Sequence, residues 1–154
     1  MLKFFTGEHE YKVEPRGRVS IPSEFRKVLD ELSSTYVYIV PQMARIEAHT
    51  CFSLPGWQVF VRQIEGKVLP KTDKDALRAA TIGKAKLVPI DDAGRIVLSE
   101  KLRNLIGVKK DVMFFGVGST FELWEPDTWR AHHEPQAARG MEIAAKLDLS
   151  ELHG

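Results

Sequence analysis

Two short motifs in this sequence place a carboxylate four residues before an arginine, with a glycine directly before that arginine. They are Glu14, Gly17 and Arg18 in the first motif, and Asp91, Gly94 and Arg95 in the second. An arginine presents a planar fork of donors that fits phosphate oxygens and the O6/N7 edge of guanine. The carboxylate can hold this fork in place before a ligand arrives. One interpretation of this spacing is a pair of loops that offer Arg18 and Arg95 to DNA, oriented by Glu14, Gly17, Asp91 and Gly94.

The same residues have a plainer interpretation, a surface salt bridge that only fastens each turn and contributes roughly 0–1 kcal/mol. The first loop also carries Arg16, a second cation, so we expect it to bind more strongly than the second. Lys3 and Lys12 lie close by in the sequence. If they take part, they are expected to contact phosphates, which position a protein without reading sequence. Arg26 and Lys27 are weaker candidates, and a solvated face is the alternative for all of these side chains.

The elements around the first motif follow from hydrophobic alternation. Polar residues separate Tyr11 from Val13 and Val19 from Ile21, which predicts two strands joined as a hairpin by the loop Pro15–Gly17. In such a loop Gly17 supplies the left-handed residue, and Glu14 is expected to face Arg18 across the loop mouth. A helix is predicted next, because apolar residues then recur at helical spacing; they are Phe25, Val28, Leu29 and Leu32.

A shift of 77 positions places this arrangement on residues 88–106. Arg18 then falls on Arg95, and the helix stripe falls on Leu102, Leu105 and Ile106. A repeat of half the chain indicates a duplicated domain. We expect a first half at residues 1–77, a second half at residues 78–134 and a tail at residues 135–154 that is partly helical or disordered.

Further strands are predicted at 36–40, 51–54, 111–117 and 121–124, with a loop at 42–50. Helices are predicted at 56–67, 73–80 and 126–133, the last ending before Pro135. The large aromatic residues could stack on bases, but they lie on apolar stripes and are expected in the core. They are Trp57, Phe60, Phe121, Trp124 and Trp129.

The composition sets broad limits. The chain has 154 residues and a formal net charge of +1, which does not by itself indicate nucleic-acid binding. Between Lys12 and Lys27, however, five basic residues face two acidic ones. The single cysteine, Cys51, excludes an internal disulfide and suits a reducing compartment. No apolar run approaches the ~20 residues that span a membrane, and the N-terminus does not resemble a cleavable leader. We therefore expect a cytoplasmic protein.

Enzyme and metal chemistry have weak signals. His49 and Cys51 form a two-ligand fragment, whereas structural zinc sites need four ligands. A hydrolase acting through Cys51 would have His49 as its only plausible partner, and a small buried hydrophobe is the favoured alternative for this thiol. No catalytic triad spacing, phosphate-binding glycine loop or zinc-protease helix is present in the sequence. We expect no catalytic residue, no metal and no cofactor.

The chain resembles the MraZ family of bacterial transcription regulators. The residues that carry the resemblance span roughly positions 3–134, and in order they are GEHEYKVEPRGRVSIPSEFR, LPGWQVFVRQI, KTDKDALR, LVPIDDAGRIVLSEKLR and VMFFGVGSTFELWEPDTWR. One position departs from the pattern: Glu14 stands where the family normally has aspartate, and Pro15 follows it. This departure bears on the geometry of the first loop.

The resemblance implies an α+β, β-rich fold, a duplicated swapped-hairpin β-barrel of the AbrB type with flanking helices. It implies a homo-oligomeric ring that binds repeated promoter elements in double-stranded DNA and represses its own division and cell-wall operon, in the cytoplasm and at the nucleoid. No membrane or small-molecule substrate is implied. The alternative from another class is an antitoxin-like protein-interaction module without a DNA role.

Overall fold

The computed structural model describes residues 4–43 and 47–147. The strands are β1 (Glu8–Lys12), β2 (Arg18–Ser20), β3 (Tyr36–Val40), β4 (Ala48–Phe52), β5 (Lys86–Pro89), β6 (Arg95–Val97), β7 (Asp111–Gly116) and β8 (Thr120–Trp124). The helices are α1 (Ser23–Glu31), α2 (Leu54–Glu65), α3 (Lys71–Ala80), α4 (Glu100–Leu105) and α5 (Pro126–Lys146), with 3₁₀ turns η1 (Pro15–Gly17) and η2 (Ile82–Lys84). The predicted α+β class is confirmed.

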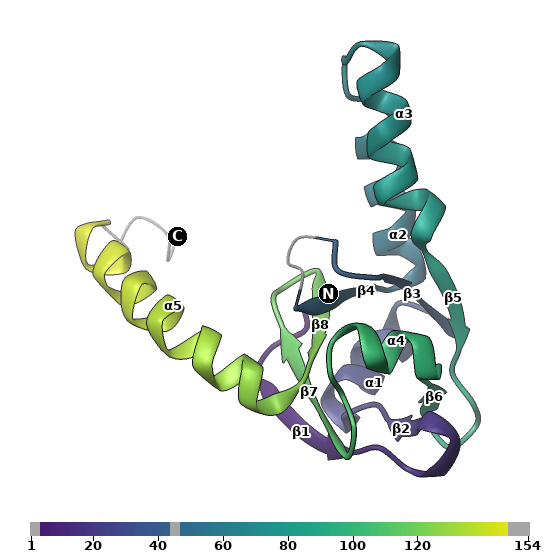
Figure 1. The fold of residues 1–154 in the computed structure, drawn as a ribbon, viewed down its shortest axis with the longest axis vertical. Coiled ribbons are helices and arrows are strands. Elements are labelled where there is room, and N and C mark those ends of the chain that lie inside the picture. Colours follow the sequence, from purple (N-terminus) through teal and green to yellow (C-terminus); the bar gives the residue numbers. More distant parts are fainter. Residues whose placement is uncertain (1–3, 44–46, 148–154) are drawn as a thin grey trace.

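The two halves of the chain share their strands. One antiparallel sheet has six strands in the order β1-β7-β8-β4-β3-β5, and β2 and β6 form a separate two-stranded ribbon. The first strand of each half pairs with the third strand of the other half, β1 with β7 and β5 with β3. Among the described strands the larger sheet is open, and no closed barrel is found. The halves are therefore interleaved and do not sit side by side as separate bodies (Figure 1).

The predicted local hairpin across the first loop is wrong. One backbone bond, from Glu14 N to Arg18 O at 2.7 Å, closes the loop. Beyond it, β1 turns toward β7 and β2 pairs with β6 of the other half. Alternation identifies strands and their buried faces, but it does not identify the partner strand. The partner is fixed here by the core, since Val19 and Ile96 face each other in the ribbon and are both almost fully buried.

The main core draws equally on both halves. The helix stripe predicted for α1 is confirmed, because Phe25, Val28 and Leu29 are buried, and Leu102 of α4 is buried in the equivalent place. Around Phe25 the rings of Phe5, Phe114 and Phe121 meet at centroid distances of 5.1–6.3 Å. The aromatic residues expected in the core are buried, apart from the partly buried Phe60; they are Trp57, Phe121, Trp124 and Trp129.

Strand β4 begins three residues earlier than predicted, inside the stretch assigned to a loop. Ala48 to Phe52 are all buried, because β4 lies between β3 and β8 in the centre of the sheet. Ser53 then ends the strand and caps α2, its Oγ accepting a hydrogen bond from the Gly56 amide at 3.1 Å. The polar residues His49 and Thr50 are buried because β4 is a central strand of the sheet. The sequence alone does not show that position.

Helix α5 continues through Pro135 to Lys146, past the point where its end was predicted. An internal proline removes one backbone bond and costs roughly 3 kcal/mol. The residues that follow include Ala137, Ala138 and Arg139, which favour a helix and resume it at once. The tail from residue 135 is thus helical as far as Lys146, and residues 148–154 lie outside the described part of the chain.

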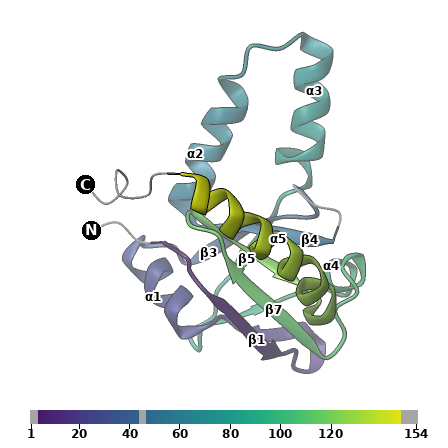
Figure 2. The ribbon, with the colours of Figure 1, turned by 90° about the vertical axis from the view of Figure 1, so that its left-hand side faces the viewer.

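Two helical arms extend from this body. Helices α2 and α3 form an antiparallel pair that rises from one end, and α5 leaves the sheet in another direction (Figures 1 and 2). Arg78 of α3 holds Glu65 of α2 through two hydrogen bonds of 2.9 and 2.6 Å. None of the helices that the structure describes is both long and apolar enough to cross a bilayer.

Candidate nucleic-acid interface

The ribbon of β2 and β6 places the two predicted arginines on one face. Arg18 lies opposite Val97, and Arg95 lies opposite Ser20. Residues between them, Val19 and Ile96, point inward and are 0% and 1% exposed. Because side chains alternate across a strand, Arg18 and Arg95 both point outward from diagonally adjacent positions. Two arginines that lie 77 positions apart in the chain thus share one surface.

Each loop is held by the other half of the chain. The Gly17 carbonyl accepts a hydrogen bond from the Leu98 amide at 2.8 Å, and the Gly94 carbonyl accepts one from the Ile21 amide at 2.9 Å. Both glycines have positive φ, +83° and +76°, a conformation that other residues rarely adopt. The two loops are consequently coupled through the ends of the ribbon.

The second loop is organised by Asp91. Its Oδ1 accepts hydrogen bonds from the amides of Ala93 and Arg95, both at 2.9 Å, and its Oδ2 accepts one from Arg95 Nε at 3.1 Å. The hydrogen bond from the Arg95 backbone is the main cause that lowers the pKa of the Asp91 carboxyl, and the Arg95 side chain adds to it. Asp91 therefore holds both the backbone and the side chain of Arg95 across the loop.

The first loop is built differently. The longer Glu14 side chain makes no capping hydrogen bond to the loop, and its carboxylate lies 3.7 Å from Nη1 of Arg95. The expected pairing of Glu14 with Arg18 is wrong, since the additional methylene carries the carboxylate past its own loop to the neighbouring one. The backbone also differs: Arg16 has a φ of 67° in addition to the positive φ of Gly17.

As a result, the cations of the first loop are exposed and are not paired with a carboxylate among the described residues. Arg16, Arg18 and Lys12 are exposed, and no described carboxylate forms an ion pair with them. Arg95, in contrast, is 31% exposed and lies between two carboxylates. Arg18 can meet a phosphate or a base edge without first releasing a partner, whereas Arg95 cannot. Lys3 lies outside the described residues.

Two further arginines, each on a helix, pack against the glycines of the loops. Arg103 of α4 packs against Gly17 and donates from Nε to the Leu98 carbonyl at 3.0 Å. Arg26 of α1 occupies the matching place beside Gly94, where an added Cβ would lie 2.2 Å from its Nε. Arg26 is therefore a loop support, and not the surface cation that the sequence suggested. Lys27 on the next position of α1 is exposed.

Sequence reasoning missed two lysines near the first loop. Lys109 and Lys110 are exposed in the turn before β7, and the Lys110 carbonyl accepts a hydrogen bond from the Val13 amide at 2.8 Å. This bond places the lysine pair beside the start of the loop that carries Arg16 and Arg18. The Lys-Lys doublet is visible in the sequence, but only the strand exchange brings it to the first loop.

His49 and Cys51, considered above as a metal or catalytic pair, are core residues. His49 Nε2 lies 2.6 Å from the Leu102 carbonyl and so carries the proton, and Nδ1 accepts a hydrogen bond from the Gln42 amide at 3.3 Å. Cys51 is completely buried, and this burial raises the pKa of its thiol well above the usual value. A buried neutral thiol is a poor nucleophile. Among the described residues no cluster of metal-ligating side chains occurs.

The buried His49 makes stability dependent on pH. Burial lowers the pKa of its imidazole in the folded protein, so the unfolded chain binds a proton at a pH where the folded chain does not. Stability from this residue is complete above the ordinary pKa of about 6.5 and is lost as pH falls below it. We expect the free energy of unfolding, measured in urea between pH 7.5 and 5, to fall with a steeper slope than in His49→Gln. Equal slopes in the two proteins would contradict this assignment.

Comparison with known proteins points to one family. A family model described as "MraZ protein, putative antitoxin-like" matches residues 81–149. A curated protein of Burkholderia cenocepacia named "Transcriptional regulator MraZ" is 35% identical over 144 residues, covering 92% of this chain and 96% of that protein. Proteins of the same name from Methylocella silvestris and Marinobacter nauticus are 31% and 30% identical, covering 93% and 87% of this chain and 87% and 89% of their own lengths.

Proposed function

Since the chain belongs to the MraZ family, whose compared members are named transcriptional regulators, we propose that it is a transcriptional regulator that binds double-stranded DNA through the outer face of the β2–β6 ribbon. The observation that carries this proposal is the placement of Arg18 and Arg95 at diagonally adjacent positions of one exposed face. Arg18 is the leading base-reading residue, and Arg16 acts beside it. Lys12, Lys109 and Lys110 contact phosphates.

The fold assignment extends to the AbrB-like swapped-hairpin class, with halves at residues 1–77 and 78–134. The exchange of first strands between the halves supports it, because β1 pairs with β7 and β5 pairs with β3. Glu14, Gly17, Asp91 and Gly94 orient the two loops. Lys3 remains a candidate phosphate contact by its position in the sequence.

A single loop with two arginines gives weak binding, so we propose that several copies act together as a ring. Regularly spaced promoter elements then meet regularly spaced loops, and the effective concentration raises avidity by roughly 10²–10⁴. The protein represses its own division and cell-wall operon by occupying the promoter, at the nucleoid in the cytoplasm. This mode of action needs neither a catalytic residue nor a cofactor.

The test is binding to DNA from upstream of the protein's own gene. We expect a fluorescence-anisotropy titration to show tight binding to that DNA, weaker binding to a shuffled sequence, and footprints at repeated elements. Affinity should fall steeply between 50 and 200 mM salt, with a slope of about −0.9 on logarithmic axes per phosphate contacted.

A flat salt response, or equal affinity for the shuffled DNA, would argue against the interface. The antitoxin-like alternative makes a different prediction, since it requires a protein partner and no DNA. Co-purification of one fixed protein partner at constant stoichiometry, with no shift of the promoter DNA, would favour that module over the regulator.

A further inference from the structure

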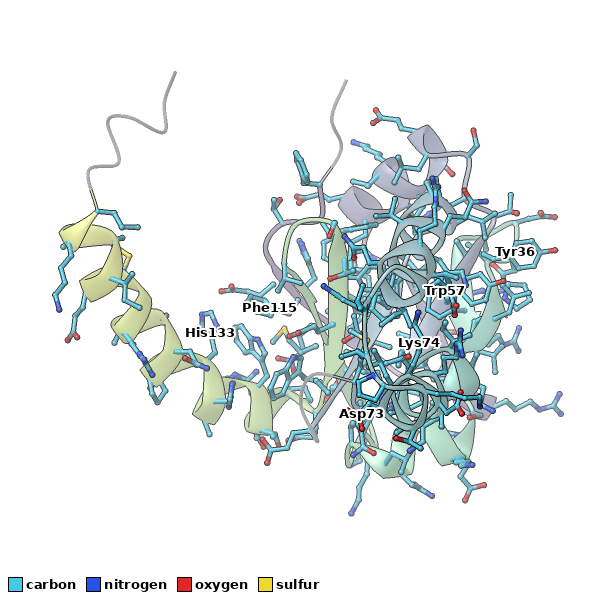
Figure 3. All side chains as sticks on the ribbon, turned by 90° about the horizontal axis from the view of Figure 1, so that it is seen from above. Tyr36, Trp57, Asp73, Lys74, Phe115 and His133 are labelled. Carbon is cyan, nitrogen blue, oxygen red and sulfur yellow. The ribbon has the colours of Figure 1, made fainter. Side chains whose placement is uncertain are left out.

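Helix α5 leaves the body of the protein with an apolar end. Its first turns are packed: Trp129 is buried, and the rings of Phe115 and His133 meet at 5.3 Å (Figure 3). Its last turns are not, since Met141, Ile143 and Leu147 are 72%, 49% and 55% exposed. A helix of 21 residues extends about 30 Å, and helical segments of this kind depend on packing for stability. The apolar end therefore needs a partner.

In the first half of the chain, the equivalent apolar surface is covered by a neighbouring segment. Helix α2 follows β4 as α5 follows β8, and its Trp57 likewise packs on the sheet, stacked on Tyr38 of β3 and against Phe52 of β4. There the α3 arm folds back, and Ile82 and Ala85 pack against the same cluster. Helix α5 has no following helix within the described residues. Within residues 47–147, the second half thus lacks the cover that the first half has.

A groove elsewhere on the protein has an apolar lining and positively charged edges that could accept this segment. It lies where the end of α3 and η2 approach α4, and its volume is about 570 Å³. Met43, Leu102 and Leu105 supply its apolar lining, and Lys84, Lys86 and Lys101 supply positive charge. No ion pair joins these lysines to a described carboxylate.

The end of the chain is complementary to this groove. Residues 141–152 carry apolar side chains at Met141, Ile143, Leu147, Leu149 and Leu152, together with three carboxylates and a single lysine. An acidic and apolar segment suits an apolar groove with a lysine rim, because ionic contacts at the edge fix the register while the apolar residues are buried.

Resting on the assembly in the proposed function, we propose that the end of α5 in one copy, residues 141–152, docks in the lysine-rimmed groove of a second copy. Helix α5 runs away from the side of the body that holds α4 and β5 (Figure 1), so the groove is filled by another copy. Segment and groove are different surfaces, so the contact is head-to-tail and propagates until the assembly closes as a ring. No residue of the η1 loop lines the groove or belongs to the segment, which leaves its arginines outside the proposed contact.

The first experiment compares two variants at positions of equal exposure. Ile143 and Val59 are both 49% exposed on helices, but only Ile143 belongs to the proposed segment. Sedimentation velocity of the full chain should show that Ile143→Asp with Leu147→Asp raises the dissociation constant of the assembly about 30-fold or more, as for a buried interface anchor. Val59→Asp should assemble like the parent. An unchanged mass for the Ile143/Leu147 variant, a parent that is monomeric, or equal losses in both variants would overturn the proposal.

The second experiment tests the charges. Reversal of Lys84, Lys86 and Lys101 to glutamate should disrupt assembly, as should reversal of Glu142, Asp148 and Glu151 to lysine. Mixing the two variants should restore both head-to-tail contacts in an alternating assembly, because each tail then meets a groove of opposite charge. Two variants that stay apart when mixed would contradict the pairing. Arg18→Ala should keep the mass of the parent. Failure of DNA binding is thus measured separately from failure of assembly.

Discussion

Replacing Arg18 with alanine is expected to abolish specific binding to the promoter repeats while leaving folding and assembly intact. The side chain is exposed on the ribbon and forms no ion pair with a described residue, so its removal costs the fold little. A bidentate contact between arginine and guanine is worth roughly 1–3 kcal/mol of discrimination. In a ring this loss recurs at every loop that meets DNA, so the total effect on avidity is far larger. Fluorescence anisotropy with promoter and shuffled DNA measures it.

Substitution of the second arginine, Arg95, should reduce DNA affinity less than substitution of Arg18. Arg95 already donates to Asp91 at 3.1 Å and lies 3.7 Å from Glu14, and these contacts must loosen before it serves DNA. We therefore expect Arg95→Ala to weaken binding less than Arg18→Ala does. Lys67→Ala provides the control, because Lys67 is an exposed cation at the tip of the α2–α3 arm. Equal affinity of Arg18→Ala and the parent protein would discard the assignment.

The largest expected effect on stability comes from Gly17→Ala. A Cβ at this position would lie 2.2 Å from the Leu98 carbonyl oxygen, a backbone atom that is part of the junction between the two halves. The ribbon would have to separate to admit it. We expect a loss of roughly 3–5 kcal/mol in the free energy of unfolding, from the clash together with the positive φ. Urea denaturation followed by circular dichroism provides the measurement.

Gly107 is the matched control for this substitution. Its φ is +70°, close to the +83° of Gly17, but an added Cβ would meet nothing within 4 Å. Gly107→Ala should therefore show only the cost of the left-handed conformation, roughly 1–2 kcal/mol. If the two variants lose the same free energy, the close approach of Gly17 to Leu98 is not what constrains this loop.

Much of the local structure could be predicted from the sequence because it depends on neighbouring residues. The helix stripe of Phe25, Val28 and Leu29 and the short reach of Asp91 to Arg95 are of this kind. The partner of each strand could not be predicted, since β1 pairs with residues 99–107 positions away and β2 with residues 75–79 positions away. The role of Glu14 depends on that pairing, because its carboxylate reaches a loop that only the strand exchange brings near.

The roles of Arg26 and Arg103 also could not be predicted from the sequence. Arg26 and Arg103 occupy equivalent places in the sequence repeat, which the shift of 77 positions reveals. Nothing in the pattern states that each would cover the glycine of the opposite loop. The sequence pattern suggests a surface cation at Arg26, because it is a charged residue on a helix next to a basic motif. In the structure the interleaved halves pack it against Gly94 instead.

The exchange of strands within one chain allows the two loops to differ from each other. In a dimer of identical chains, any change in one loop is copied into the other by symmetry. Here both loops are encoded separately but remain mechanically joined through Gly17, Leu98, Ile21 and Gly94. The loop with the short acid fastens its arginine through Asp91, whereas the other loop presents two exposed cations. Under the proposed function, one loop therefore contacts DNA while the other holds the ribbon together.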